Sequence, residues 1–192
     1  MKTLAGNLEF SYCFLADNSD PHVDFTYHAD TIAHICEIFS TDVEKGLTTE
    51  QAAINREKSG KNKYRDNDYI TKYTKCKRDG EYQHFKSRKL TIGDIVSLEA
   101  PLVVPATASC LVNKSILTGE SEPQKVSSEK TDDNPLDTQN IVFATTKIVQ
   151  GACTGIVVNV GKHTTAGAVR PFVRNQRLLF EPKEFQWYFK RV

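Results

Sequence analysis

The chain has 192 residues, of which 39% are hydrophobic and 26% are charged, and its formal net charge is +1. This length suits one globular domain or a small domain with extensions, and the composition is typical of a folded soluble protein. The small net charge argues against a strong overall attraction to nucleic acid, which we do not expect as a partner. No run approaches the roughly 20 apolar residues that a membrane-spanning helix needs, so we expect a soluble chain. The cysteine pattern described next fits a cytoplasmic location.

The five cysteines stand at positions 13, 36, 76, 110 and 153, and none belongs to a Cys-x-x-Cys pair. An odd number at irregular spacing fits a reducing compartment, with most of the thiols acting as small apolar side chains. His34 and Cys36 are too weak a pattern for zinc and are interpreted as residues of a helix face. We therefore expect no metal or cofactor site in this chain.

Residues 1–27 show no period and are interpreted as an irregular extension. Two short helices are predicted after them, which together form a small helical hairpin. Asp30 is the predicted N-cap of the first helix, whose apolar face has the i, i+3, i+4, i+7 spacing of Ile32, Ile35, Cys36 and Phe39.

Thr48 and Gln51 form a capping-box pattern that starts the second helix, and Gly60 stops it. Residues 61–75 are polar, and residues 63–75 of this stretch are interpreted as a linker, with strands expected from about residue 76.

Turn residues divide the region from residue 76 into strands. Asp79-Gly80 is a pair favoured in tight hairpins, and Gly93-Asp94 is a second turn that leads into Ile95–Leu98. Two β-rich runs, Ile141–Val149 and Cys153–Val160, are predicted to form a hairpin around Gln150-Gly151.

A candidate catalytic turn lies at Thr118-Gly119-Glu120-Ser121. Gly119 permits a tight backbone turn, Glu120 supplies a carboxylate, and the flanking hydroxyls can hold a phosphoryl oxygen or orient water. Taken alone, four such residues are more often a solvated surface turn.

The context of this turn resembles the actuator (phosphatase) domain of P-type cation-pump ATPase alpha subunits of the sodium/potassium- and proton/potassium-transporting type. The N-terminal part, about residues 28–62, is similar to the cytosolic segment that precedes the first membrane helix of these pumps. The matching segments of the actuator part are Arg78-Asp79-Gly80-Glu81, Gly93-Asp94-Ile95-Val96, Ser115–Gln124, Asn134–Ile141 and Gly155–Val158.

The resemblance implies a role in hydrolysing a phosphorylated aspartate. In the family, the glutamate of this loop positions the attacking water, which assigns Glu120 that role here. Thr118 and Ser121 would shape the loop, and Gly119 would allow close approach to the phosphate. The complete family enzyme uses ATP and Mg²⁺ and works at the cytosolic face of the plasma membrane; the partner implied here is the phosphorylation domain of a full-length pump.

Departures from the family pattern limit this expectation. A short linker at residues 63–75 replaces the first two membrane helices, and the Asp-Lys-Thr-Gly-Thr phosphorylation motif is absent. We therefore do not expect this chain alone to hydrolyse ATP or transport ions.

Residues 101–107 (Pro-Leu-Val-Val-Pro-Ala-Thr) lack both acids of the corresponding family pattern. The expected fold is a mostly β, antiparallel, jelly-roll-like actuator domain, incomplete by about one strand and marginally stable, after the helical hairpin.

The expected organisation is an extension (1–27), a helical segment (28–62), a linker (63–75), the actuator (76–168) and a basic aromatic tail (169–192). The tail holds six Lys/Arg and two Asp/Glu, a net charge of +4. Three functions stay open: a truncated actuator module, a non-catalytic soluble protein that binds or regulates an intact pump, and a non-functional remnant.

Overall fold

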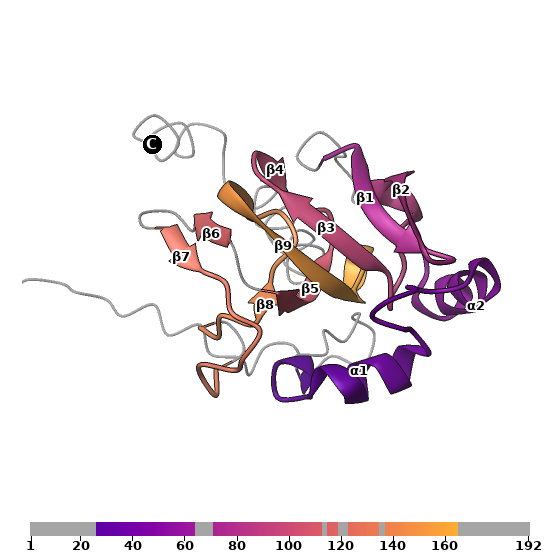
Figure 1. Ribbon diagram of the computed structural model, residues 1–192, viewed down its shortest axis with the longest axis horizontal. Coiled ribbons are helices and arrows are strands. Elements are labelled where there is room, and N and C mark those ends of the chain that lie inside the picture. The colour runs from indigo at the N-terminus through magenta and orange to yellow at the C-terminus, as the bar shows by residue number, and fades with distance from the viewer. Residues whose placement is uncertain (1–25, 64–70, 113–114, 119–122, 135–136, 165–192) are drawn as a thin grey trace, which may run out of the picture.

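Two helices and one antiparallel sheet make up the computed structural model (Figure 1). It describes residues 26–63, 71–112, 115–118, 123–134 and 137–164. Within this part of the chain no helix is long and apolar enough to cross a membrane.

The two α-helices precede the sheet in the chain, as α1 (Ile32–Phe39) and α2 (Thr49–Ser59). Three short 3₁₀ turns are η2 (Thr26–His28) before α1, η4 (Ser87–Lys89) after the second strand and η5 (Gly161–His163) after the last strand. The strands are β1 (Tyr73–Arg78), β2 (Glu81–Lys86), β3 (Ile95–Glu99), β4 (Leu102–Val103), β5 (Thr107–Val112), β6 (Ser115–Thr118), β7 (Pro123–Lys125), β8 (Ile141–Val142) and β9 (Lys147–Asn159).

Strand β9 organises the sheet. The main path of hydrogen-bonded neighbours is β2-β1-β3-β9-β5-β8, and β4 and β6 pair with the first part of β9, while β7 pairs with β6. Each of these pairings is antiparallel. The prediction of a mostly β, antiparallel fold after two helices is confirmed; its jelly-roll character and the loss of about one strand stay predictions.

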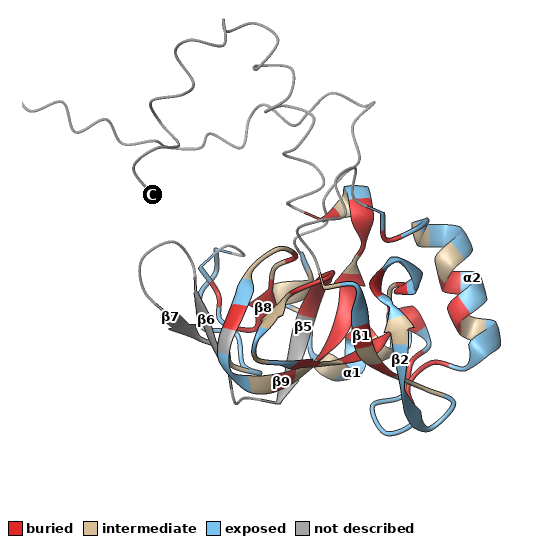
Figure 2. Ribbon diagram, turned by 90° about the horizontal axis from the view of Figure 1, so that it is seen from above, coloured by how far each residue is buried: buried red, intermediate tan, exposed pale blue. Residues whose placement is uncertain are grey.

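Alternating residues of the strands build a core on each face of the sheet, as the two-residue period of a strand requires. Val96 and Val157 belong to the larger core, which also holds Cys76, Leu98, Val104 and Ile148. Ile95 and Ile156 point to the other face, where Ile35 and Phe39 of α1 cover them. The buried residues accordingly follow the strands in the middle of the molecule (Figure 2).

The two helices start and stop largely as their sequences predict. The N-cap of α1 is Thr31, whose hydroxyl accepts a hydrogen bond from the His34 amide, so the predicted Asp30 is wrong by one residue. The Asp30 carboxylate lies 3.0 Å from His34 Nδ1 instead. The α2 prediction is confirmed, because Thr48 caps its first turn and Gly60 its last.

The predicted turn at Asp79-Gly80 is confirmed as the connection of the β1–β2 hairpin. Arg78 pairs with Glu81 across it, and both turn residues have positive φ, 50° and 85°. Such values match the tight turns that suit the twist of paired strands. Strand β1 begins at Tyr73, however, so the strands start three residues before the predicted position and part of the expected linker belongs to the sheet.

The predicted hairpin around Gln150-Gly151 is wrong. Residues 147–159 form the single strand β9, and the turn that precedes it contains Thr145, whose φ is 72°. Gly151 has a φ of 80° inside the strand. There β9 changes partners: residues up to Gly151 pair with β4 and β6, and residues from Ala152 pair with β3 and β5. Glycine here allows a bend within a strand, not its reversal.

The predicted domain boundaries stay predictions. The extension at residues 1–25, most of the linker (64–70) and the tail at 169–192 lie outside the described residues.

Candidate functional site

The two strands that flank the candidate catalytic turn form a hairpin. Ile116, Leu117 and Thr118 of β6 pair with the three residues of β7, and Thr118 lies opposite Pro123. The four residues 119–122 therefore connect two strand ends that are paired with each other. Thr118 is the last residue of β6; Gly119, Glu120 and Ser121 lie outside the described residues, so their predicted roles stay predictions.

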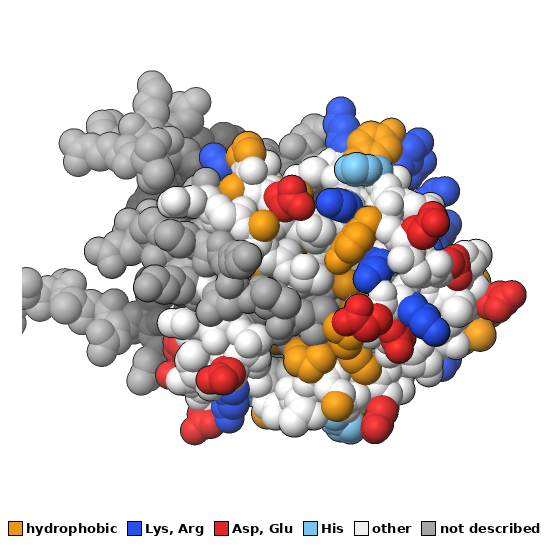
Figure 3. Space-filling view, in the orientation of Figure 1, with side chains coloured by type: hydrophobic (Ala, Val, Ile, Leu, Met, Phe, Trp, Pro, Cys, Tyr) orange, Lys and Arg blue, Asp and Glu red, His pale blue; other side chains and the backbone are white. Residues whose placement is uncertain are grey.

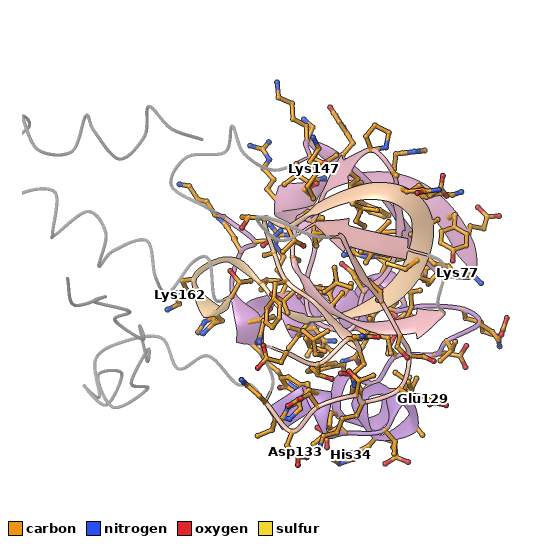
Figure 4. All side chains as sticks on the ribbon, turned by 90° about the vertical axis from the view of Figure 1, so that its left-hand side faces the viewer. His34, Lys77, Glu129, Asp133, Lys147 and Lys162 are labelled. Atoms are coloured by element: carbon orange, nitrogen blue, oxygen red, sulfur yellow. The ribbon has the colours of Figure 1, made fainter. Side chains whose placement is uncertain are left out.

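Strand β9 ties this hairpin to the core. Thr118 pairs with Lys147 and Leu117 with Ile148, while β4 pairs with the same two residues of β9 from the other side. Ile148 is fully buried in the larger core, and Lys147 begins β9 at the surface (Figure 4). The backbone at the base of the candidate loop is thus held by a central strand.

The chain that leaves β7 leads to a network of polar residues. The Ser127 amide donates to the Gln139 carbonyl oxygen, which joins the start of this segment to its end. Thr138 Oγ1 donates to Asn140 Oδ1 (2.7 Å), and Asn140 Nδ2 donates to the His28 carbonyl oxygen (2.9 Å). His28 Nε2 lies 3.0 Å from the Asp133 carbonyl oxygen. The segment between β7 and β8 therefore contacts the N-terminal part of the chain through Asn140 and Asp133.

An ion pair inside the sheet joins two of the family-like motifs. Arg78 donates from Nε and Nη2 to the two carboxylate oxygens of Asp94, each at 2.7 Å, and Asp94 is fully buried. The Thr91 amide also donates to Asp94, and the Arg78 guanidinium lies 4.6 Å from the Phe85 ring centroid. These motifs hold the end of β1 to the turn that precedes β3.

Burial and the ion pair together shift the pKa values of Arg78 and Cys76. Burial lowers the pKa of the Arg78 guanidinium, but the hydrogen bonds and charge of Asp94 outweigh burial and raise this pKa above its usual value. Burial, together with the charge of Asp94, raises the pKa of the Cys76 thiol far above its usual value. Cys76 is therefore an apolar core residue, as predicted, and not a nucleophile.

The loop before α2 contacts the β1–β2 turn closely. The Asp79 carboxylate accepts hydrogen bonds from the hydroxyl (2.5 Å) and the amide (3.0 Å) of Thr49. These bonds, the hydroxyl first, hold the pKa of Asp79 below its usual value. Gly46 packs so tightly here that an added Cβ would lie 2.1 Å from the Lys77 carbonyl oxygen.

Two buried asparagines that the sequence did not identify join the helical part to the sheet. Asn62 Nδ2 donates to the carbonyl oxygens of Ser87 and Pro105, and its Oδ1 accepts from the Gly161 amide. Asn55 of α2 donates to the carbonyl oxygens of Phe39 and Ile92. For Asn55 a signal existed, since it stands three residues after the apolar Ala52, on the buried side of the helix.

The described residues contain no group of three or more His, Cys, Asp or Glu side chains that could hold a metal ion. In the part of the chain covered by the structure, the polar side chains described above bind the backbone or one another. Their arrangement holds strands and helices in place, and the candidate chemistry rests on the segment between β6 and β7.

Comparisons with known proteins agree with the motifs. Residues 68–174 match the family model of the P-type ATPase actuator domain, and residues 27–78 match that of the cation transporter/ATPase N-terminus. Among solved structures, that of a zinc-transporting PIB-type ATPase in the E2.Pi state covers 59% of this chain and 18% of its own, at 19% identity and a TM-score of 0.47.

Curated relatives resemble about half of the chain. The sodium/potassium-transporting ATPase alpha subunit of Tetronarce californica is 42% identical over 98 residues, 48% of this chain and 10% of its own length. The human potassium-transporting ATPase alpha chain 2 is 43% identical over the same share of this chain and 9% of its own. The alpha-B subunit of Artemia franciscana is 41% identical over 52% of this chain and 11% of its own. This chain thus spans about a tenth of the length of these relatives. Because one actuator model matches more than half of its residues, the chain belongs to the P-type ATPase actuator-domain family.

Proposed function

We propose that this chain is an actuator module of a P-type cation-transporting ATPase of the sodium/potassium-exchanging type. Its Thr118–Ser121 loop would assist hydrolysis of an aspartyl phosphate held on another domain. The observation that supports the proposal is the pairing of Thr118 with Pro123, because the segment 119–122 connects two paired strand ends, and the first of these strands, β6, also pairs with β9.

The proposed reaction is a hydrolysis. The oxygen of a water molecule forms a bond to phosphorus, and the bond from phosphorus to the aspartyl oxygen breaks, which leaves a carboxylate and inorganic phosphate. The carboxylate of Glu120 accepts a proton from the attacking water and orients it. A loop on a packed strand pair suits this task, because a catalytic group must be held within a fraction of an ångström of its productive position.

ATP and Mg²⁺ would serve the complete enzyme by forming the phosphorylated aspartate. The Asp-Lys-Thr-Gly-Thr motif that carries this aspartate in the family does not occur in this sequence. The substrate of the loop is therefore proposed to lie on a phosphorylation domain supplied in trans or by a longer protein.

The test uses the full chain and a sodium/potassium-type pump whose own loop glutamate is replaced by glutamine, so that its aspartyl phosphate accumulates. Release of radiolabelled phosphate is measured with the wild-type chain, with Glu120→Gln and with Glu122→Gln. We expect the wild-type chain and Glu122→Gln to speed the release, and Glu120→Gln to lose this effect by about 100-fold or more.

Glu122→Gln is the matched control, because it removes the same charge from the same four-residue segment. Equal loss in both variants, or no acceleration by the wild-type chain, contradicts the catalytic proposal. If the chain binds the pump without any acceleration, the alternative of a non-catalytic pump-binding protein is supported instead.

A further inference from the structure

One face of the β1–β2 ribbon carries lysine and tyrosine side chains. In the antiparallel register, Tyr73 lies opposite Lys86, Lys75 opposite His84, and Lys77 opposite Tyr82. Side chains opposite each other in such a pair share a face. The lysine–tyrosine face therefore consists of Tyr73, Lys75, Lys77, Tyr82, His84 and Lys86.

This face is open to solvent, while the other side of β1 is part of the core. Tyr73 is 53% exposed and Tyr82 is 43% exposed, whereas Thr74 and Cys76 between the lysines are buried. Strand β2 is also the edge of the sheet. In the space-filling view, Lys and Arg side chains gather beside hydrophobic ones and a histidine over β1 and β2 (Figure 3).

The ribbon is a concentration of positive charge. Residues 71–90 hold seven Lys/Arg and two Asp/Glu, a net charge of +5, while the whole chain has +1. Asp94 neutralises Arg78 of this segment, and the face itself carries the three lysines Lys75, Lys77 and Lys86. Two carboxylates border the face: Glu99, 3.8 Å from Lys75, and Asp42, whose charge interacts with that of Lys77. Lys86, opposite Tyr73, is the third cation of the face.

We propose that the lysine–tyrosine face binds a membrane surface that contains anionic phospholipid headgroups. Lysine ammonium groups are compact charges that attract headgroup phosphates, and basic residues near an anionic surface act together. Tyrosine suits the boundary between headgroups and acyl chains, because its ring is apolar and its hydroxyl is polar.

The arrangement around Tyr82 favours lipid over single-stranded nucleic acid. The ammonium groups of Lys75 and Lys77 each lie 5.3 Å from the centroid of the Tyr82 ring. A nucleobase would have to stack on this ring, and the two cations compete for its π-system. The same cations, spread over an open face, fit an array of separate headgroups without stacking.

The test measures sedimentation of the full chain with vesicles at about 0.1 M salt, where the Debye length is about 10 Å. Vesicles of phosphatidylcholine alone are compared with an equimolar mixture of phosphatidylcholine and phosphatidylserine. We expect binding to the mixture only, weakened by added salt. Replacing Lys75, Lys77 and Lys86 by glutamine should lower the affinity about fivefold for each lysine.

The control variant replaces Lys58, Lys61 and Lys162 by glutamine, and it changes the net charge equally. All three are exposed, and Lys77 and Lys162 lie on opposite sides of the molecule in the view of Figure 4. We expect this control to keep its affinity within about twofold, since charges beyond a Debye length are screened. Matching thermal transitions would show that both variants fold.

Several results would overturn the proposal. Equal losses in both variants would mean that only net charge matters. Undiminished binding of the lysine–tyrosine variant would place the contact elsewhere, for example at residues 169–192. Tighter binding to single-stranded RNA or to polyglutamate than to the mixed vesicles would assign the face to a different partner. The proposal does not depend on the activity of Glu120, so the two experiments fail separately.

Discussion

Arg78 donates two hydrogen bonds of 2.7 Å to the carboxylate of Asp94, whose side chain is fully buried. This pair fixes the end of β1 to the turn that begins β3. The pair joins two separate motifs of the actuator family, residues 78–81 and residues 93–96, which lie side by side in the sheet. Both motifs are visible in the sequence, but only the fold shows that the charge of Arg78 in the first neutralises the charge of Asp94 in the second.

Removing one partner of this pair should strongly destabilise the fold. Asp94→Ala leaves the guanidinium of Arg78, only 13% exposed, without its carboxylate. We expect the free energy of unfolding to fall by about 3–5 kcal/mol, because an uncompensated charge stays buried. Urea denaturation of wild type and variant measures this difference.

Glu99→Ala is the control for this prediction, since it breaks the exposed pair with Lys75, whose side chains are 60% and 43% exposed. An exposed pair contributes about 0–1 kcal/mol. A similar small effect of Asp94→Ala would show that the buried pair does not stabilise the sheet.

Two glycines with similar backbone angles should respond differently to alanine. Gly46 (φ 74°) and Gly80 (φ 85°) both adopt the left-handed region, but an added Cβ at Gly46 would meet the Lys77 carbonyl oxygen, and one at Gly80 would meet nothing within 4 Å. We expect Gly80→Ala to cost about 1–2 kcal/mol from backbone strain alone, and Gly46→Ala to cost clearly more. Thermal unfolding of the two variants compares them directly; equal losses would mean that the contact of Gly46 with β1 relaxes easily.

Local features were predictable from the sequence because their physical causes are local. The Asp79-Gly80 turn needs only two residues that tolerate positive φ, and α2 needs only a hydroxyl at Thr48 and a glycine at its end. The prediction of a hairpin turn at Gly151 was wrong because the role of this glycine depends on distant residues. Whether a glycine ends a strand or bends it depends on which strands lie beside it, and those of β9 come from distant parts of the chain.

Long-range polar contacts were not predictable. Asn62 belongs to a polar stretch that resembles a linker, yet it is fully buried and bonds Ser87, Pro105 and Gly161, up to 99 residues away. Nothing in its immediate neighbours specifies these partners. The candidate site also combines a local and a long-range feature. Its tetrapeptide is recognisable in the sequence, but the pairing of β6 with β9 follows only from the sheet.

The Asp79–Thr49 contact should make stability depend on pH in the acidic range. The pKa of Asp79 is lowered in the folded state by the hydroxyl and amide of Thr49. Its stabilising effect is therefore fully present above the unfolded-state pKa, about 3.9, and is lost as the pH falls through the lower folded-state pKa. Asp79→Asn keeps the shape and tolerates the φ of 50° at this position, but it removes the charge.

We expect wild type to be more stable than Asp79→Asn at neutral pH, and the difference to shrink as the pH falls below about 4. Urea denaturation at a series of pH values measures it. Glu57→Gln removes one exposed carboxylate from the same helix, α2, and separates the local contact from the change in net charge. Because Thr49 begins α2, the wild type should also lose protection of the first-turn amides of that helix as the acid titrates. A pH dependence shared by both variants would show that Asp79 acts only as one more surface charge.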